Sequence, residues 1–186
     1  MAIKINTNSV IAEADYRTSP NFDERPEQAE ISLLVIHNIS LPPKVFGGSY
    51  IVDFFLNKLD ISVDPFFETI ADLKVSSHLF INREGKIIQF VPFDKRAWHA
   101  GKSQFEGVSN CNDYSIGIEL EGTDNILYTK EQYEALIKST MAIMDRYPAI
   151  TMDRITGHSN IAPERKTDPG NSFNWKKYLD GLKCQK

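Results

Sequence analysis

Residues 32–37 read SLLVIH, a short and nearly continuous apolar run with β-branched members. This pattern is typical of a strand that is buried on both faces. The run ends at His37, so we expect an imidazole at the end of a buried strand. A second strand is predicted at residues 115–121, SIGIELE, where apolar residues alternate with other types. The alternation places Glu119 and Glu121 on one face of that strand.

Further helices and strands surround these two segments. We expect helices at 51–58, 64–74, 129–147 and 175–182, a hairpin of strands 78–82 and 86–91, a strand end at 155–158, and loops at 41–49, 98–113 and 159–174. The helix at 129–147 has the strongest signals, because Thr129 and Gln132 match a capping box and Pro148 ends the pattern. The long loop at 159–174 suggests function, since structureless loops of that length are uncommon in compact domains.

The size and composition of the chain indicate one globular domain, 1–186. It has 186 residues, of which 41% are hydrophobic and 25% charged, as in ordinary soluble domains. Residues 1–31 are polar and acidic and contain Pro20 and Pro26, which disfavour a long regular element. We therefore expect residues 1–31 to form an irregular N-terminal wrap.

Charge and targeting signals exclude several classes of protein. The net charge is 21 − 25 = −4, whereas a nucleic-acid-binding surface is normally basic. Cys111 and Cys184 lie far apart and form no disulfide framework. No run approaches the roughly 20 apolar residues of a membrane span, and the N-terminus lacks the features of a secretory signal. We expect a cytoplasmic protein with a small-molecule substrate, without nucleic acid, membrane span or obligate protein partner.

Three residues are candidate metal ligands: His37, His158 at the end of a later strand, and Asp168 ten residues further on. Two imidazoles and a carboxylate suit zinc (Zn²⁺), and three protein ligands leave the fourth tetrahedral position open for water. Such a site would be catalytic, because zinc lowers the pKa of its water to about 7. The alternative from spacing alone is that each histidine is a hydrogen-bonded structural residue.

Two further residues are candidates for catalysis. Glu119 lies between apolar neighbours, and a carboxylate there is costly unless it is paired or used, so it is the candidate base. We expect Glu121, near the strand end, to be solvent-facing or structural. Lys166 precedes Asp168 by two residues, and in an extended segment both side chains would point the same way. A cation there would stabilise an oxyanion, and the alternative is a solvated charge cluster.

Several long blocks of the sequence resemble one enzyme family. The blocks are VIHNISLPP at 35–43, FGG at 46–48, VPFDKRAWHAG at 91–101, CNDYSIGIELEGTD at 111–124 and TGHSNIAPERKTDPG at 156–170. Together they are similar to the AmpD family of cytoplasmic 1,6-anhydro-N-acetylmuramyl-L-alanine amidases. That family belongs to a superfamily that includes phage amidases and peptidoglycan recognition proteins. The resemblance implies an α+β fold in which helices flank a mixed central β-sheet, with the site at one sheet edge.

The resemblance also assigns roles to residues. It implies that His37, His158 and Asp168 bind zinc, and that Glu119 and Lys166 form the catalytic pair. Asn38 and the segment 98–101 match parts of the substrate cleft, with Trp98 as a wall for a sugar ring, although a half-buried core aromatic is the alternative. The implied reaction is hydrolysis of the amide between the lactyl group of anhydro-N-acetylmuramic acid and L-alanine. The resemblance implies that this reaction serves cell-wall recycling and, in bacteria with that circuit, lowers the signal that induces β-lactamase.

The sequence also departs from the wider superfamily. Ser77 stands where phage amidases and recognition proteins commonly have a tyrosine before the histidine of the first hairpin strand, and His78 is expected to be structural. Lys74 and Asn110 stand where close relatives can carry arginines. Lysine and asparagine do not replace the bidentate contacts of arginine with carboxylates, so the affinity for the peptide is in question. Two rival functions are a secreted or phage-type amidase that acts on intact peptidoglycan and a non-catalytic module that binds muropeptides.

Overall fold

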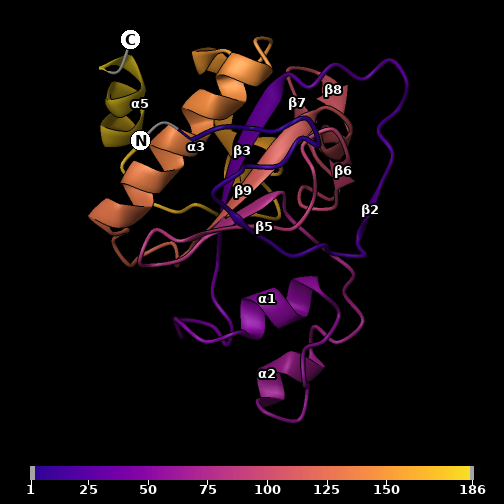
Figure 1. Cartoon of the computed structure of the whole chain (residues 1–186). Coiled ribbons are helices and arrows are strands. Elements are labelled where there is room, and N and C mark those ends of the chain that lie inside the picture. Colours follow the sequence, from indigo (N-terminus) through magenta and orange to yellow (C-terminus); the bar gives the residue numbers. More distant parts are fainter. Residues whose placement is uncertain (1–2, 185–186) are drawn as a thin grey trace.

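The computed structural model describes residues 3–184, and its centre is a six-stranded mixed sheet. In spatial order the strands are β1 (Asp15–Tyr16), β5 (Ile87–Gln89), β4 (Leu79–Ile81), β9 (Ser115–Glu121), β3 (Leu33–Ile39) and β10 (Ile155–Gly157). Neighbouring strands are parallel except for the β4–β5 hairpin, which is antiparallel as predicted. With the helices beside it, this sheet confirms the predicted α+β class (Figure 1).

Strands β3 and β9 form the longest pair and are the core of the sheet. Residues 33–36 of β3 are fully buried, as an apolar run between two covered faces requires. The strand continues to Ile39, so His37 lies within β3 and not at its tip, which corrects the expected boundary. In the parallel register His37 pairs with Glu119, so both side chains leave the sheet on the same face.

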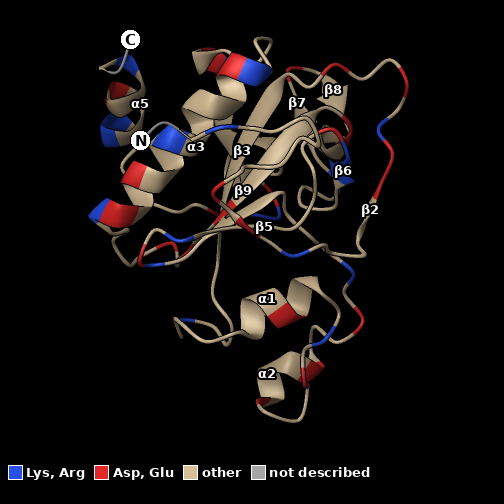
Figure 2. Ribbon diagram, in the orientation of Figure 1, with Lys and Arg blue, Asp and Glu red and all other residues tan. Residues whose placement is uncertain are grey.

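Helices α3 (Lys130–Arg146) and α5 (Trp175–Lys183) lie together beside one face of the sheet (Figure 1). The predicted capping box of α3 is present, because Thr129 accepts from the amide of Gln132 and Gln132 accepts from the amide of Thr129. Apolar side chains of β3 and β9 pack under these helices in the main core cluster. Outward-facing residues of α3 and α5 carry interspersed charges of both signs (Figure 2).

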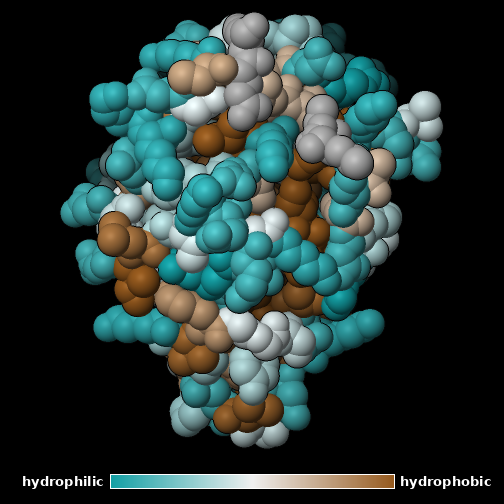
Figure 3. Space-filling view, turned by 60° about the vertical axis from the view of Figure 1, so that its left-hand side comes forward, coloured by the Kyte–Doolittle hydropathy of each residue, from teal (hydrophilic) through white to brown (hydrophobic). Residues whose placement is uncertain are grey.

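Helices α1 (Tyr50–Phe55) and α2 (Pro65–Glu68) form a lobe beyond the sheet, shown at the bottom of Figure 1. Asp64 caps α2 as expected, but the helix predicted at 64–74 ends at Glu68. Backbone hydrogen bonds then continue only between residues three apart, as in Leu73 to Ile70. The apolar spacing that suggested a helix is every third residue and fits these tighter turns. Brown apolar side chains gather on this lower part of the surface (Figure 3).

Short elements complete the fold, and some were not predicted. They are β2 (Phe22–Asp23) paired with β6 (Arg96–Ala97), β7 (Gln104–Phe105) paired with β8 (Val108–Ser109), the 3₁₀ turns η1 (Cys111–Asp113) and η2 (Met152–Arg154), and α4 (His158–Ile161). The β7–β8 hairpin occupies what was expected to be a continuous loop. In residues 3–184 no helix combines the length and the apolar character that crossing a membrane requires.

Candidate metal centre and active site

His37, His158 and Asp168 converge at one point beside the sheet. Strand β10 pairs with β3 so that Gly157 lies opposite Ile36, and the next residues are His158 and His37. His158 is the first residue of α4, one residue beyond the strand end expected for it. The two Nδ1 atoms are 2.9 Å apart, and each lies 3.1 Å from Oδ2 of Asp168. Within residues 3–184 this is the one group of three or more His, Cys, Asp and Glu side chains arranged so that they could hold a metal ion.

The donor geometry of this cluster fits zinc. Ligand atoms bound to tetrahedral zinc at about 2.0–2.1 Å lie about 3.3 Å from one another, close to the separations observed here. Nε2 of His158 lies 3.1 Å from the carbonyl oxygen of Ala100, which can only accept a hydrogen bond. A ring proton on that nitrogen leaves a lone pair on Nδ1, directed at His37 and Asp168. Three buried electron-rich atoms that face one another suit a shared cation.

The pKa shifts in the cluster have consistent causes. Burial lowers the pKa of His37 to about 4, so this ring is neutral near pH 7, as a metal ligand must be. Burial raises the pKa of Asp168, but hydrogen bonds to His158 and His37 lower it more. The net pKa of Asp168 lies well below its ordinary value, so the site presents the neutral imidazole of His37 beside an ionised carboxylate.

Glu119 lies on β9 directly beside His37 and borders the same cleft as Asp168. Its Oε2 atom is buried and has no hydrogen-bond partner within the described residues. Burial raises the pKa of Glu119 well above its ordinary value, and the negative charge of Asp168 raises it further, while Lys166 lowers it. An unpartnered carboxyl group with a raised pKa, next to a candidate metal centre, has the properties of a general base or acid.

A cleft of about 350 Å³ opens over these residues. Lys166 and Asp168 both line it. Asn38 also lines the cleft, and its amide nitrogen donates to Oδ1 of Asp124 at 2.9 Å. Trp98 is half-buried and lines the cleft.

The lobe of α1 and α2 provides the opposite, apolar wall of this cleft. Its lining residues are Leu41, Phe54, Phe55, Phe66, Ile70, Leu73 and Val75. Sequence reasoning did not find this wall, because these residues follow the ordinary apolar pattern of a core. The turns after α2 give the wall its shape, since they bring Ile70 and Leu73 to the cleft instead of continuing a helix.

Some of the other residues singled out in the sequence line the cleft and some do not. Of the segment 98–101, Trp98 and His99 line the cleft, whereas Ala100 is fully buried. Glu121 is structural: it is 2% exposed and accepts hydrogen bonds from the amides of Gly47 and Arg83.

His78, Lys74 and Asn110, which the sequence analysis also discussed, do not line the cleft. His78 is structural too, since its Nδ1 accepts from the amide of Gly117 and Nε2 lies 3.0 Å from the carbonyl oxygen of Lys95. Lys74 and Asn110 are both exposed and do not line the cleft.

Fold and site together define a mixed-sheet protein with a buried His–His–Asp cluster and an adjacent glutamate beside a cleft, in which parallel strands supply one histidine and the glutamate. The sequence model of the N-acetylmuramoyl-L-alanine amidase family matches residues 27–171. The chain belongs to this family, within its AmpD branch, and is an amidase.

Individual relatives support this assignment. The 1,6-anhydro-N-acetylmuramyl-L-alanine amidase AmpD of Citrobacter freundii is 55% identical over 168 residues, which cover 90% of this chain and 89% of the relative. A crystal structure of an AmpD selenomethionine derivative is 53% identical, with a TM-score of 0.92, and the match covers 94% of this chain and 97% of that one. The amidase AmiD of Escherichia coli, solved with anhydro-N-acetylmuramic acid-L-Ala-D-γ-Glu-L-Lys, is 30% identical with a TM-score of 0.59, covering 85% of this chain and 60% of AmiD.

Proposed function

We propose that this chain hydrolyses the amide bond between the lactyl group of 1,6-anhydro-N-acetylmuramic acid and the L-alanine of the stem peptide, with zinc as its cofactor. The observation that carries the proposal is the convergence of His37, His158 and Asp168 beside a cleft that His158, Asp168 and Glu119 line. The names of the AmpD relatives support the substrate, because they are described as 1,6-anhydro-N-acetylmuramyl-L-alanine amidases.

In this proposal His37, His158 and Asp168 hold the metal. Bound zinc would supply Lewis-acid chemistry, namely a polarised carbonyl group and a water nucleophile available near neutral pH. Glu119 accepts the proton of the attacking water and returns it to the leaving amine, which its raised pKa favours. Lys166, at the cleft edge, places a positive charge where the tetrahedral oxyanion develops.

Substrate binding follows from the two walls of the cleft. Asp124 accepts from the amide nitrogen of Asn38, which leaves the amide oxygen of Asn38 available to accept a hydrogen bond from the substrate. Trp98 offers a ring on which a sugar face can stack, and the apolar lobe excludes water from the opposite side. A compact muropeptide is therefore the proposed ligand.

We also propose a cellular role. Soluble anhydro-muropeptides arise from wall turnover, and an enzyme that removes their peptides would act in recycling in the cytoplasm, as a single amidase domain. By consuming these fragments it would lower the signal that induces β-lactamase, in bacteria that carry that response. The acidic net charge of −4 favours soluble fragments over the anionic wall, because a wall-binding surface gains from basic residues.

Mass spectrometry of products tests this function. Zinc-loaded protein is incubated with anhydro-muropeptide or with purified sacculi, and with metal-free protein as the control. We expect free peptide and anhydro-N-acetylmuramic acid from the soluble substrate, far slower release from sacculi, and no release by metal-free protein. Faster release from sacculi would favour the phage-type rival. Binding of the muropeptide without product would identify a binding module, and full activity after chelation would exclude the metal mechanism.

A further inference from the structure

His99 contacts the candidate metal ligand His37 from the side away from the cluster. Nε2 of His37 lies 2.9 Å from Nδ1 of His99, and Nε2 of His99 lies 3.1 Å from Oγ of Ser115. The two rings meet edge to face, and His99 is 9% exposed. The three groups therefore form a hydrogen-bonded series that starts at the ligand and ends on strand β9.

The donors and acceptors in this series follow from the need for an unprotonated Nδ1 on His37. Nδ1 of His37 must be unprotonated to bind a metal, so the ring proton of a neutral His37 lies on Nε2. That proton is donated to Nδ1 of His99, and the proton on Nε2 of His99 is then donated to Ser115. One acceptor, Nδ1 of His99, thus selects both the tautomer and the ring orientation of His37.

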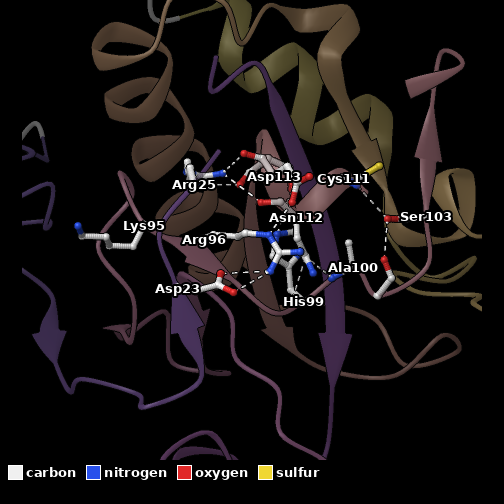
Figure 4. Close-up of polar contacts among 12 residues, drawn as sticks. Asp23, Arg25, Lys95, Arg96, His99, Ala100, Ser103, Cys111, Asn112 and Asp113 are labelled. Carbon is white, nitrogen blue, oxygen red and sulfur yellow. Dashed lines mark hydrogen bonds and ion pairs between the residues drawn. The ribbon is translucent and has the colours of Figure 1, made fainter. Parts of the chain in front are cut away.

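The neighbouring residue does the same for the other imidazole. The carbonyl oxygen of Ala100 accepts from Nε2 of His158, so two consecutive residues hold both histidines of the cluster. Their backbone is fixed in turn by Asn112, whose Oδ1 accepts from the amides of His99 and Ala100 at 3.1 and 2.8 Å. Figure 4 shows Asn112 against this pair of residues.

Gly117 makes the room that the His99 ring occupies. A Cβ atom at position 117 would lie 2.5 Å from Cγ and Nδ1 of His99, closer than any real contact. The glycine of strand β9 thus permits the ring to lie against the sheet, within reach of His37. This gives a reason for a glycine in the middle of a buried strand, where it otherwise weakens the sheet.

We propose that His99 is a positioning residue for the metal centre: by accepting the Nε2 proton of His37, it holds that ring in the tautomer and orientation that bind zinc. This inference rests on the proposed zinc site and adds a residue to it. For this role His99 needs only a hydrogen-bond acceptor at the position of Nδ1. It takes no part in the reaction of the substrate.

Two amide variants separate this acceptor role from simple packing. The asparagine side chain ends near the position of histidine Nδ1, whereas the glutamine side chain ends near that of Nε2. We expect H99N, with Oδ1 as the acceptor, to keep a zinc dissociation constant within about threefold of wild type. H99Q should bind zinc about 10–100-fold more weakly, the usual cost of losing such an outer partner. The constant is measured by competition with a chromophoric chelator, without any substrate.

The controls separate the possible failures. I143V trims a fully buried core side chain of α3 away from the site, so it should lower stability and leave zinc affinity unchanged. If wild-type protein binds no zinc, the proposed function fails. If wild type binds one zinc ion but H99Q binds it equally well, or H99N is as weak as H99Q, only the present inference fails.

G117A provides a second test of the same proposal if H99Q does not fold. G117A leaves every polar group in place but displaces the His99 ring, so it should weaken zinc binding about 10–100-fold as well. Nitrogen-15 spectra of the imidazoles should show the Nε2-protonated tautomer of His37 in wild type and a mixture of tautomers in G117A. Wild-type affinity in G117A, or a His37 protonated on Nδ1 in wild type, would overturn the proposal.

Discussion

Replacing Glu119 with glutamine tests the proposed base, because the change keeps the size of the side chain and removes its ability to take a proton. General acid–base catalysis contributes about 10²–10⁴ in rate, which corresponds to about 2.7–5.5 kcal/mol of barrier. We expect kcat of E119Q on anhydro-muropeptide to fall by that factor. Zinc content should stay near that of wild type, since Glu119 is not one of the three clustered ligands.

The same variant should change stability with a definite dependence on pH. In the metal-free protein, burial raises the pKa of Glu119 well above its ordinary value. The unfolded chain releases this proton near pH 4.3, roughly, so above that pH the native state holds more protons than the unfolded state. Wild-type stability therefore falls as pH rises toward the raised pKa, by at most about 1.4 kcal/mol per pH unit. E119Q lacks this loss, so its stability relative to wild type increases over the same interval.

Urea unfolding of both proteins between about pH 4 and pH 7 measures this difference. Glu121→Gln is the matched control, because it neutralises a carboxylate of the same strand that accepts two backbone hydrogen bonds. We expect E121Q to destabilise the protein by about 1–3 kcal/mol, the opposite sign. If the free energies of unfolding of wild type and E119Q change with pH in parallel, the conclusion that the carboxyl group of Glu119 is buried and unpaired is wrong. More than a tenth of the wild-type kcat in E119Q would refute its role as the base.

Three further results are expected. D168N should lose zinc, measured by atomic emission, while circular dichroism shows the fold retained; a full zinc complement would remove Asp168 from the ligand set. W98A should raise KM for anhydro-muropeptide more than W98F does and leave zinc content unchanged, and an unchanged KM would place Trp98 outside the binding surface. T129A should cost about 1 kcal/mol and lower Tm by about 2–4 °C, because the cap of α3 is lost; an unaltered Tm would show that the cap contributes nothing.

Local sequence signals predicted the regular elements well. The strands around His37 and Glu119 and the helix that begins after Thr129 follow from periodicity and capping, which act over a few residues. The helix predicted at 64–74 was wrong beyond Glu68, because a three-residue apolar spacing fits both a helix and successive tight turns. The β7–β8 hairpin was missed since each strand has two residues, too few to show an alternation.

Some features of the site could also be predicted from the sequence, and others could not. The residue types at 37, 158 and 168 suggested a metal centre, and the structure brings them together, but no local pattern states that β10 pairs with β3. His99 drew no separate attention because the partner that gives it a role is 62 residues away. The apolar wall of the cleft was equally hidden, since lining a cleft and filling a core require the same side chains. Long-range packing decides these cases, and a single sequence does not display it.

The order in which the strands of the sheet are made has a consequence during synthesis on the ribosome. Strand β3 lies between β9 and β10, and 121 residues separate His37 from His158. At about 5–20 residues per second, translation leaves roughly 6–24 seconds between these two histidines. Until β9 (Ser115–Glu121) is made, β3 has neither neighbour, and from then until β10 (Ile155–Gly157) is made it has only one. In that time the apolar side chains of β3 are open to chaperones that bind nascent chains. The side chains of His37, His158 and Asp168 can therefore meet only after residue 168 has left the ribosome.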